Sequence, residues 1–317
     1  MGFRMKGIVY EGYIMPMTAF HPHSGLDLTW RGGAIDTIVR KRLRAQPQPL
    51  SRTLDQIWPA AFFGLDRVDV FRQAEPALQR TVLAACARLT IEEGYFIEKA
   101  GVSFMARMTL LARSVDERSL YALFGAEEAN HLALLQTALG EVDEQAWQGN
   151  PFLTLLGDLT DVCDRLTGQL VIQTVLEGWG LTHYASLREA CLDAQMSGIL
   201  NTILIDEAGH HGSALVLLDG KRFDADATRR AVEPLAQMLS MVQMGPAMVM
   251  GALERALGGF TTAQRETVYA QLDGDNHARI RLSKLRALME KVRGAGPVVE
   301  ALAARKLFSP QAVAGLT

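Results

Sequence analysis

One spacing occurs twice in this chain and constrains its fold more than any other feature. The pattern is Glu-x29-Glu-x-x-His, and its six residues are Glu98, Glu128 and His131 in the first copy and Glu177, Glu207 and His210 in the second. On a helix, side chains three residues apart project from the same face. A single Glu-x-x-His is weak evidence, but two copies with matching distant glutamates are hard to reconcile with solvated charged faces.

The chemistry of these six residues favours a pair of metal ions. Helix bundles hold two metals with one Glu from each of two helices and Glu-x-x-His from each of the other two. Four carboxylates balance the charge of two divalent ions, and the oxygen and imidazole donors suit iron or manganese better than copper. The spacing therefore predicts that all six residues are metal ligands.

The same six residues resemble those of the ferritin-like di-iron carboxylate superfamily, which includes ferritins, rubrerythrins, fatty-acyl desaturases, ribonucleotide reductase small subunits and bacterial monooxygenase hydroxylases. The resemblance covers roughly residues 76 to 220. It implies a four-helix bundle that holds two iron ions, or manganese with iron, and uses O2 as oxidant. None of these branches matches in detail. Asn130 and Gly209 stand where the hydroxylases tend to carry Arg in one motif, and Ile203 stands where arylamine N-oxygenases carry a further His.

Acidic residues also precede the two motifs. Glu127 lies four residues before His131, and Asp206 lies four residues before His210. Metal-bound histidines usually donate their second ring N–H to a carboxylate, which fixes the orientation of the ring. We expect each acid to hold the histidine that follows it on its own helix.

The first ligand could be Glu98 or Glu93. In an antiparallel pair of helices, residues at the same height are equidistant from the turn. Glu98 and Glu128 have their midpoint at residue 113, inside the predicted break from Arg113 to Asp116, whereas Glu93 would place it inside the helix. Glu98 is therefore preferred, with Glu93 as the alternative.

Hydrophobic periodicity predicts an all-α fold, and the resemblance implies that it is a ferritin-like four-helix bundle with additional N- and C-terminal helices. The expected bundle helices are Pro76–Leu111, Glu117–Leu139, Pro151–Asp193 and Met196–Leu218, followed by Ala225–Leu257, kinked at Pro246, and Thr262–Val292. We expect a single domain, with residues 1–75 as an arm with short helices, 76–220 as the bundle and 221–317 as accessory helices. Trp58, Phe62 and Phe63 should supply core.

Several side chains share faces with the ligands. Tyr95 and Tyr184 are expected to be hydrogen-bonded core residues rather than radical sites. His183 lies six residues beyond Glu177, outside the i+3 and i+4 positions, so it is a candidate for lining a cavity but not for binding metal directly.

Glycines are unusually frequent beside the ligands. Gly94, Gly101, Gly125 and Gly180 sit within four residues of a predicted ligand, although each costs on the order of 0.5–1 kcal/mol in a helix. They indicate either space beside the metals or close packing between helices. Gly178 and Gly180, just after the third glutamate, also suggest a π-bulge there.

Composition excludes several classes of protein. With 49% hydrophobic and 21% charged residues the chain reads as globular, and its net charge of −3 gives no argument for nucleic acid or an anionic membrane. Three scattered cysteines favour a reducing compartment. No apolar run reaches about 18 residues, so we expect no membrane contact and a cytoplasmic location.

These observations predict a di-iron oxygenase or oxidase that uses O2 and a small organic substrate. The alternative is an iron-oxidising or peroxide-scavenging protein of the ferritin and rubrerythrin type. The chain has no CxxC pair and no Gly-x-Gly-x-x-Gly motif, so electrons or peroxide should come from an external source. Met238, Met241, Met244 and Met248 form a stripe at helical spacing that indicates core packing, or else a substrate channel or a contact in a homodimer.

Overall fold

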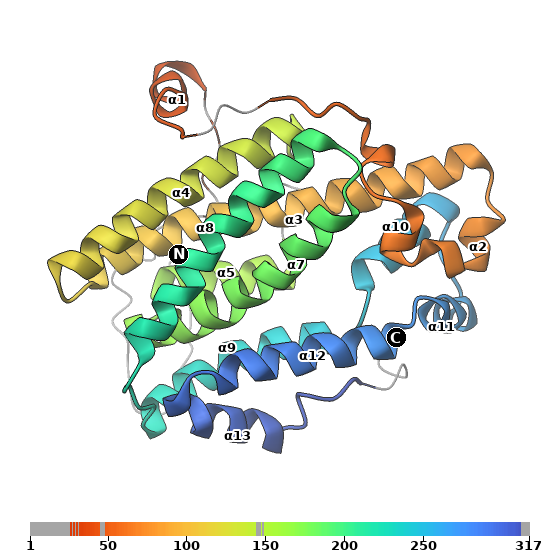
Figure 1. Ribbon diagram of the computed structural model, residues 1–317. Coiled ribbons are helices and arrows are strands. Elements are labelled where there is room, and N and C mark those ends of the chain that lie inside the picture. The colour runs from red at the N-terminus through yellow and green to blue at the C-terminus, as the bar shows by residue number, and fades with distance from the viewer. Residues whose placement is uncertain are drawn as a thin grey trace, which may run out of the picture.

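The computed structural model describes residues 26, 28, 30, 32–44, 48–143, 147 and 149–311. Within these residues, every regular element is a helix (Figure 1). The predicted all-α class is confirmed for these residues. Residues 1–25 of the expected arm lie outside them. None of the described helices combines the length and apolar character that crossing a membrane requires.

The first hairpin consists of α3 (Pro76–Leu111) and α4 (Val115–Leu139), close to the predicted bounds. Pro76 occupies the first turn of α3, where its missing N–H costs nothing. Ser114 caps α4 by accepting a hydrogen bond from Glu117 N at 3.1 Å, and Gly140 ends the helix with a positive φ of 71°. Local sequence signals therefore fix this hairpin.

The expected helix from Pro151 to Asp193 is interrupted, and this prediction was wrong. The structure has α5 (Pro151–Val162) and then α6 (Arg165–Gly168), because Asp164 accepts hydrogen bonds from Leu166 N (3.0 Å) and Thr167 N (3.1 Å) and so starts a new helix. Arg107 of α3 donates to the carbonyls of Asp161 and Cys163 at the end of α5. The lost helical hydrogen bonds are thereby replaced.

A π-helix, Gln169–Leu176, joins α6 to α7 (Glu177–Ala190). The sequence suggested a π-bulge at Gly178 and Gly180, but the wide turns come before the third glutamate instead. Seven of the eight π-helical residues are buried. Glu177 therefore stands at the junction where the wide turns end and the α-helix begins.

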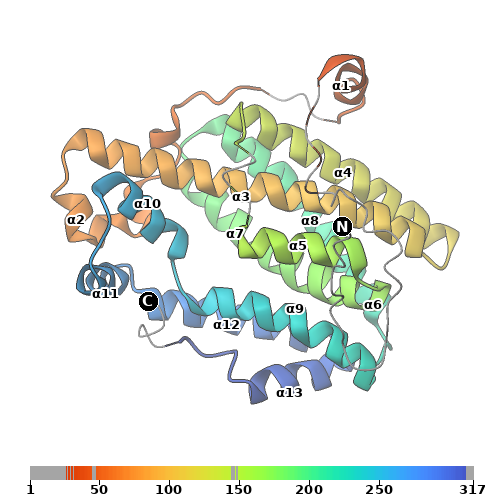
Figure 2. The ribbon, with the colours of Figure 1, turned by 180° about the vertical axis from the view of Figure 1, so that it is seen from behind.

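α8 (Ala194–Leu218) completes the second hairpin and begins close to the predicted start at Met196. α3 packs against α4, α7 against α8, and α4 against α8 (Figure 1). Seen from behind, α5 lies along α3 (Figure 2). The four helices that carry the predicted ligands thus surround one interior.

The described part of the C-terminal third forms five α-helices, not the two expected. They are α9 (Ala225–Gln243), α10 (Ala247–Leu257), α11 (Thr262–Gln271), α12 (Gly274–Glu290) and α13 (Gly296–Ala304). Gly245, with a φ of 74°, and Pro246 separate α9 from α10, so the expected kink is a complete break. Asp273, with a φ of 56°, separates α11 from α12. Of the methionine stripe, Met238 is buried and Met244 is exposed.

The described part of the N-terminal segment adds α1 (Gly33–Arg40), three short 3-10 turns and α2 (Asp69–Arg72); the turns are Leu54–Gln56, Ala60–Phe63 and Leu65–Arg67. Trp58 is almost completely buried and donates a hydrogen bond to the carbonyl of Leu187 at 2.8 Å. Phe63 is also buried, and Phe62 packs beside it. The prediction that these aromatics supply core is confirmed.

Asp193 connects this N-terminal segment to the bundle. Its buried carboxylate caps α8 at Met196 N (2.8 Å) and accepts from Ser51 N (2.9 Å), Ser51 Oγ (2.6 Å) and Arg52 N (2.8 Å).

Asp193→Ala leaves these donors without an acceptor. Asp193→Ala should therefore lower the free energy of unfolding, measured by urea denaturation at pH 7, by about 1–3 kcal/mol, and Asp193→Asn should lower it by a smaller amount.

The pH dependence of that loss gives a further check. Burial opposes ionisation of Asp193, but the hydrogen bonds from Ser51, Met196 and Arg52 outweigh it and hold its pKa below the ordinary value of 3.8. A depressed folded-state pKa stabilises the protein fully above the unfolded pKa, and this stability is lost as pH falls through the folded pKa. The difference between wild type and Asp193→Asn should therefore shrink on acidification, and a constant difference would contradict this role.

Candidate metal centre

All six predicted side chains converge in the interior of the four helices. They form two overlapping groups whose donor atoms lie within 4.8 Å of one another, namely Glu98, Glu128, His131 and Glu207, and Glu128, Glu177, Glu207 and His210. Glu177 is partly exposed and the other five are buried. Either group could hold a metal ion, and Glu128 and Glu207 belong to both.

The structure places Glu98, not Glu93, in the cluster. Glu98 Oε2 lies 3.0 Å from His131 Nδ1. Glu93 lies one to two turns earlier on α3 and belongs to neither group. Burial raises the pKa of Glu93, and the positive charge of Arg281 on α12 opposes this rise. Glu98, the residue that the hairpin midpoint favours, is thus the one that meets the other residues of the cluster.

The outer acids hold the histidines of the opposite motif, so the predicted pairing within each helix was wrong. His131 Nε2 on α4 donates to Asp206 Oδ2 on α8 at 2.9 Å, and His210 Nε2 on α8 donates to Glu127 Oε2 on α4 at 3.0 Å. In both rings, Nδ1 faces the carboxylates of the cluster and Nε2 faces the neighbouring helix. Because α4 and α8 are adjacent, the acid within reach of Nε2 comes from the partner helix.

Arg44 connects the two outer acids. Its guanidinium pairs with Asp206, and its second terminal nitrogen lies 3.6 Å from Glu127 Oε1. The Arg44 side chain is 55% exposed, so it bridges the acids from the solvent side. Sequence reasoning missed this residue because nothing local indicates that the N-terminal segment returns to α4 and α8.

Burial and mutual repulsion dominate the electrostatics of the cluster. Burial, followed by the charge of Glu207, raises the pKa values of Glu128 and Glu177 well above the ordinary value. Burial disfavours protonated His131, but hydrogen bonds to Asp206 and Glu98 outweigh it and raise its pKa to about 10. The cluster therefore favours bound positive charge, as protons on these groups or as cations.

Two buried donor atoms in the cluster lack a hydrogen bond within the described part of the chain, Glu177 Oε2 and His210 Nδ1. His210 Nδ1 lies 3.3 Å from Glu128 Oε1, but without hydrogen-bond geometry. Buried polar atoms are rarely left unsatisfied. Both are atom types that can ligate iron and manganese, and both are on residues that belong to the cluster. The donor set therefore fits a pair of metal ions.

Gly101 makes room for one of the shared carboxylates. A Cβ on Gly101 would overlap Glu128 Oε2 and lie 2.5 Å from Glu128 Cδ. Gly125 differs, because its Cβ would meet Met105 Cβ at 3.5 Å, an ordinary contact between α3 and α4. The two explanations for the glycines thus apply to different positions: space for a carboxylate of the cluster at Gly101 and helix packing at Gly125.

The aromatic candidates differ in what they contact. Tyr184 Oη donates to Glu98 Oε1 at 2.6 Å, as expected for a hydrogen-bonded core tyrosine. The His183 ring lies 6.1 Å from the Tyr184 ring, tilted by 44° to it, and burial together with the charge of Arg281 lowers the pKa of His183 to about 4. Tyr95 is buried, and its ring lies 5.2 Å from that of Phe96.

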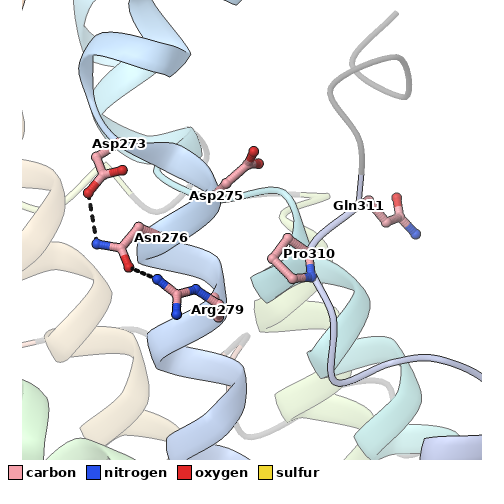
Figure 3. A pocket seen from close by; sticks show the side chains of 6 residues that line it. All are labelled: Asp273, Asp275, Asn276, Arg279, Pro310 and Gln311. Atoms are coloured by element: carbon pink, nitrogen blue, oxygen red, sulfur yellow. Dashed lines mark hydrogen bonds between the residues drawn. The ribbon is translucent and has the colours of Figure 1, made fainter.

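A hollow of about 440 Å³ near the start of α12 shares no residue with the cluster. Its lining consists of Asp273, Asp275, Asn276, Arg279, Pro310 and Gln311 (Figure 3). Asn276 donates to Asp273 Oδ2 at 2.8 Å and accepts from Arg279 at 2.5 Å (Figure 3). These groups satisfy one another within the accessory helices, so the hollow gives no second candidate for the chemistry.

The crossed pairing makes a specific prediction for Asp206. Asp206→Ala should weaken metal affinity about 10–100-fold, because it removes the acceptor that orients His131. In NMR of the zinc-loaded protein with ¹⁵N-labelled histidine, the variant should shift the ring-nitrogen signals of His131 more than those of His210, relative to wild type. Asp158→Ala, at an exposed aspartate of α5, is the matched control. A larger change at His210 would contradict the crossed arrangement.

The glycines allow a second, sterically matched comparison. Gly101→Ala should displace the Glu128 carboxylate and reduce bound iron, measured by elemental analysis of reconstituted protein. Gly125→Ala should keep its iron, since its Cβ meets only an ordinary contact. Both variants should retain their helical circular dichroism, because alanine is the better helix former. Normal iron content in Gly101→Ala would show that Glu128 is not a ligand in this position.

No protein-family model matches this chain, and no curated protein matches it either. The comparisons therefore assign it to no family. The interpretation of the cluster rests on the six convergent side chains, the crossed outer acids and the unsatisfied donor atoms.

Proposed function

We propose that this protein is a ferritin-like di-iron oxidoreductase, an oxygenase or oxidase that uses O2 to act on a small organic substrate. Two iron ions would be held by the six convergent residues, with manganese and iron as the alternative pair. The observation that carries this proposal is the overlap of the two donor groups at Glu128 and Glu207. Shared carboxylates bring two metal ions close enough to act together on one small molecule.

When bound, an iron pair supplies two electrons and open coordination positions for O2. The side chains around the iron pair would orient its ligands and exclude water. Asp206 and Glu127 fix the rings of His131 and His210, so each Nδ1 stays directed at the cluster. Burial of His131 and His210 excludes bulk water from their side of the site.

Tyr184 holds the orientation of Glu98. Its hydroxyl donates to Glu98 Oε1, while His131 Nδ1 lies beside Oε2 of the same carboxylate. Burial raises the pKa of Tyr184 well above the ordinary value, and the negative charges of Glu98 and its neighbours reinforce this shift. Tyr184 therefore keeps its proton and remains a donor.

Oxygen consumption tests the proposed function. The chain contains no motif for an electron carrier of its own, so iron(II)-loaded protein should consume about one O2 per iron pair and stop. A reductase system should restart consumption, and so should anaerobic reduction with dithionite that is removed before O2 is added again. Glu207→Ala should abolish it, and Glu93→Ala, a glutamate of α3 outside the cluster, should retain it. An oxygen electrode measures all four reactions.

Two other results would replace this function. Accumulation of many iron ions per chain as a mineral core would identify an iron-oxidising storage protein. Sustained turnover of hydrogen peroxide, with no oxidation of added organic compounds, would identify a peroxide scavenger. Both outcomes keep the metal cluster but change what it acts on.

A further inference from the structure

A basic hollow of about 770 Å³ lies where α8 ends, beside the end of α12. Its charged lining consists of Lys221, Arg222, Lys291, Arg293 and Asp219. All four cationic residues are exposed, and Asp219, the acid among the lining residues, is already paired with Arg293 at 3.0 Å. This surface is locally positive on a chain whose net charge is −3.

Close contact between two loops creates the hollow. Phe223 N donates to the carbonyl of Gly294 at 3.4 Å. A Cβ on Gly294 would overlap the carbonyl oxygen of Lys221 and lie 2.9 Å from its carbonyl carbon. Only glycine permits this approach, which brings Lys221 and Arg222 beside Arg293. The concentration of positive charge is therefore fixed by the packing of the backbone.

The hollow is near the candidate metal centre. Leu215 and Leu218 line it, and both follow His210 on α8. At about 1.5 Å per residue, they lie about 8 and 12 Å along the helix from His210. The hollow therefore lies within about two turns of α8 from His210 of the cluster.

We propose that this hollow docks an acidic one-electron carrier protein, such as a ferredoxin or a flavodoxin, which reduces the metal centre. The inference rests on the proposed function, which needs electrons that the chain cannot store. Complementary charge steers such a partner to this surface. Val216, which also lines the hollow and is 75% exposed, adds an apolar contact. Two reduced carriers each lose one electron, and two iron(III) ions become two iron(II) ions, with no bond made or broken.

Charge reversal tests the docking surface directly. Lys221→Glu with Arg222→Glu removes the positive charge of one loop, and Arg80→Glu with Arg118→Glu makes the same change in net charge at exposed positions on α3 and α4. The probes are a plant-type [2Fe–2S] ferredoxin and a flavodoxin, titrated calorimetrically into the full chain before iron is added. At least one carrier should bind wild type. Its Kd should rise about 10-fold or more in the first variant, stay within about 2-fold in the second, and rise with salt.

A second readout follows the metal directly. Reduction of the iron-loaded protein by the carrier that binds should slow by the same factor in the Lys221→Glu, Arg222→Glu variant, whereas reduction by dithionite should not change. Binding of neither carrier, or binding unaffected by the charge reversal, would overturn the proposal. Binding of inorganic phosphate at the hollow without either carrier would make it a small-anion site instead.

These outcomes separate the docking surface from the proposed function. If the iron pair forms and dithionite reduces it but neither carrier does, the docking proposal fails and the oxidoreductase proposal stands. If the chain binds no iron pair, the proposed function fails, and the carrier titration still measures whether the hollow binds an acidic protein.

Discussion

The interior of this protein is organised around the repulsion among four carboxylates that share one buried site. Removing such groups from water is costly unless positive charge accompanies them. His131 and His210 lie between the carboxylates, and the outer acids Asp206 and Glu127 hold the far sides of their rings. Arg44 then spans the outer acids from the surface. Charge therefore alternates outward in layers from the cluster to solvent, and each layer depends on the one inside it.

The six convergent residues could be predicted because their geometry is set locally. A separation of three residues on a helix fixes Glu128 with His131 and Glu207 with His210, and the hairpin turn fixes the height of Glu98. The end of α4 at Gly140 could also be predicted, because a single glycine sets it. These features involve only short stretches of chain.

Features that depend on contacts between distant parts of the chain could not be predicted from local spacing. The break at Asp164 needs Arg107 of α3 to satisfy the exposed carbonyls, and the crossed pairing of the outer acids needs α4 and α8 to be neighbours. Arg44 approaches from a segment without strong periodicity. In each case local spacing allowed two arrangements, and packing between helices selected one of them.

Mössbauer spectroscopy of protein reconstituted with ⁵⁷Fe tests the central claim most directly, because it reports both the number of iron ions and whether they interact. The account predicts two high-spin ferric ions per chain after oxidation, coupled through the shared carboxylates Glu128 and Glu207, and no electron paramagnetic resonance signal from the pair. One iron per chain, or two magnetically isolated ferric ions, would contradict the assignment of these carboxylates as shared ligands.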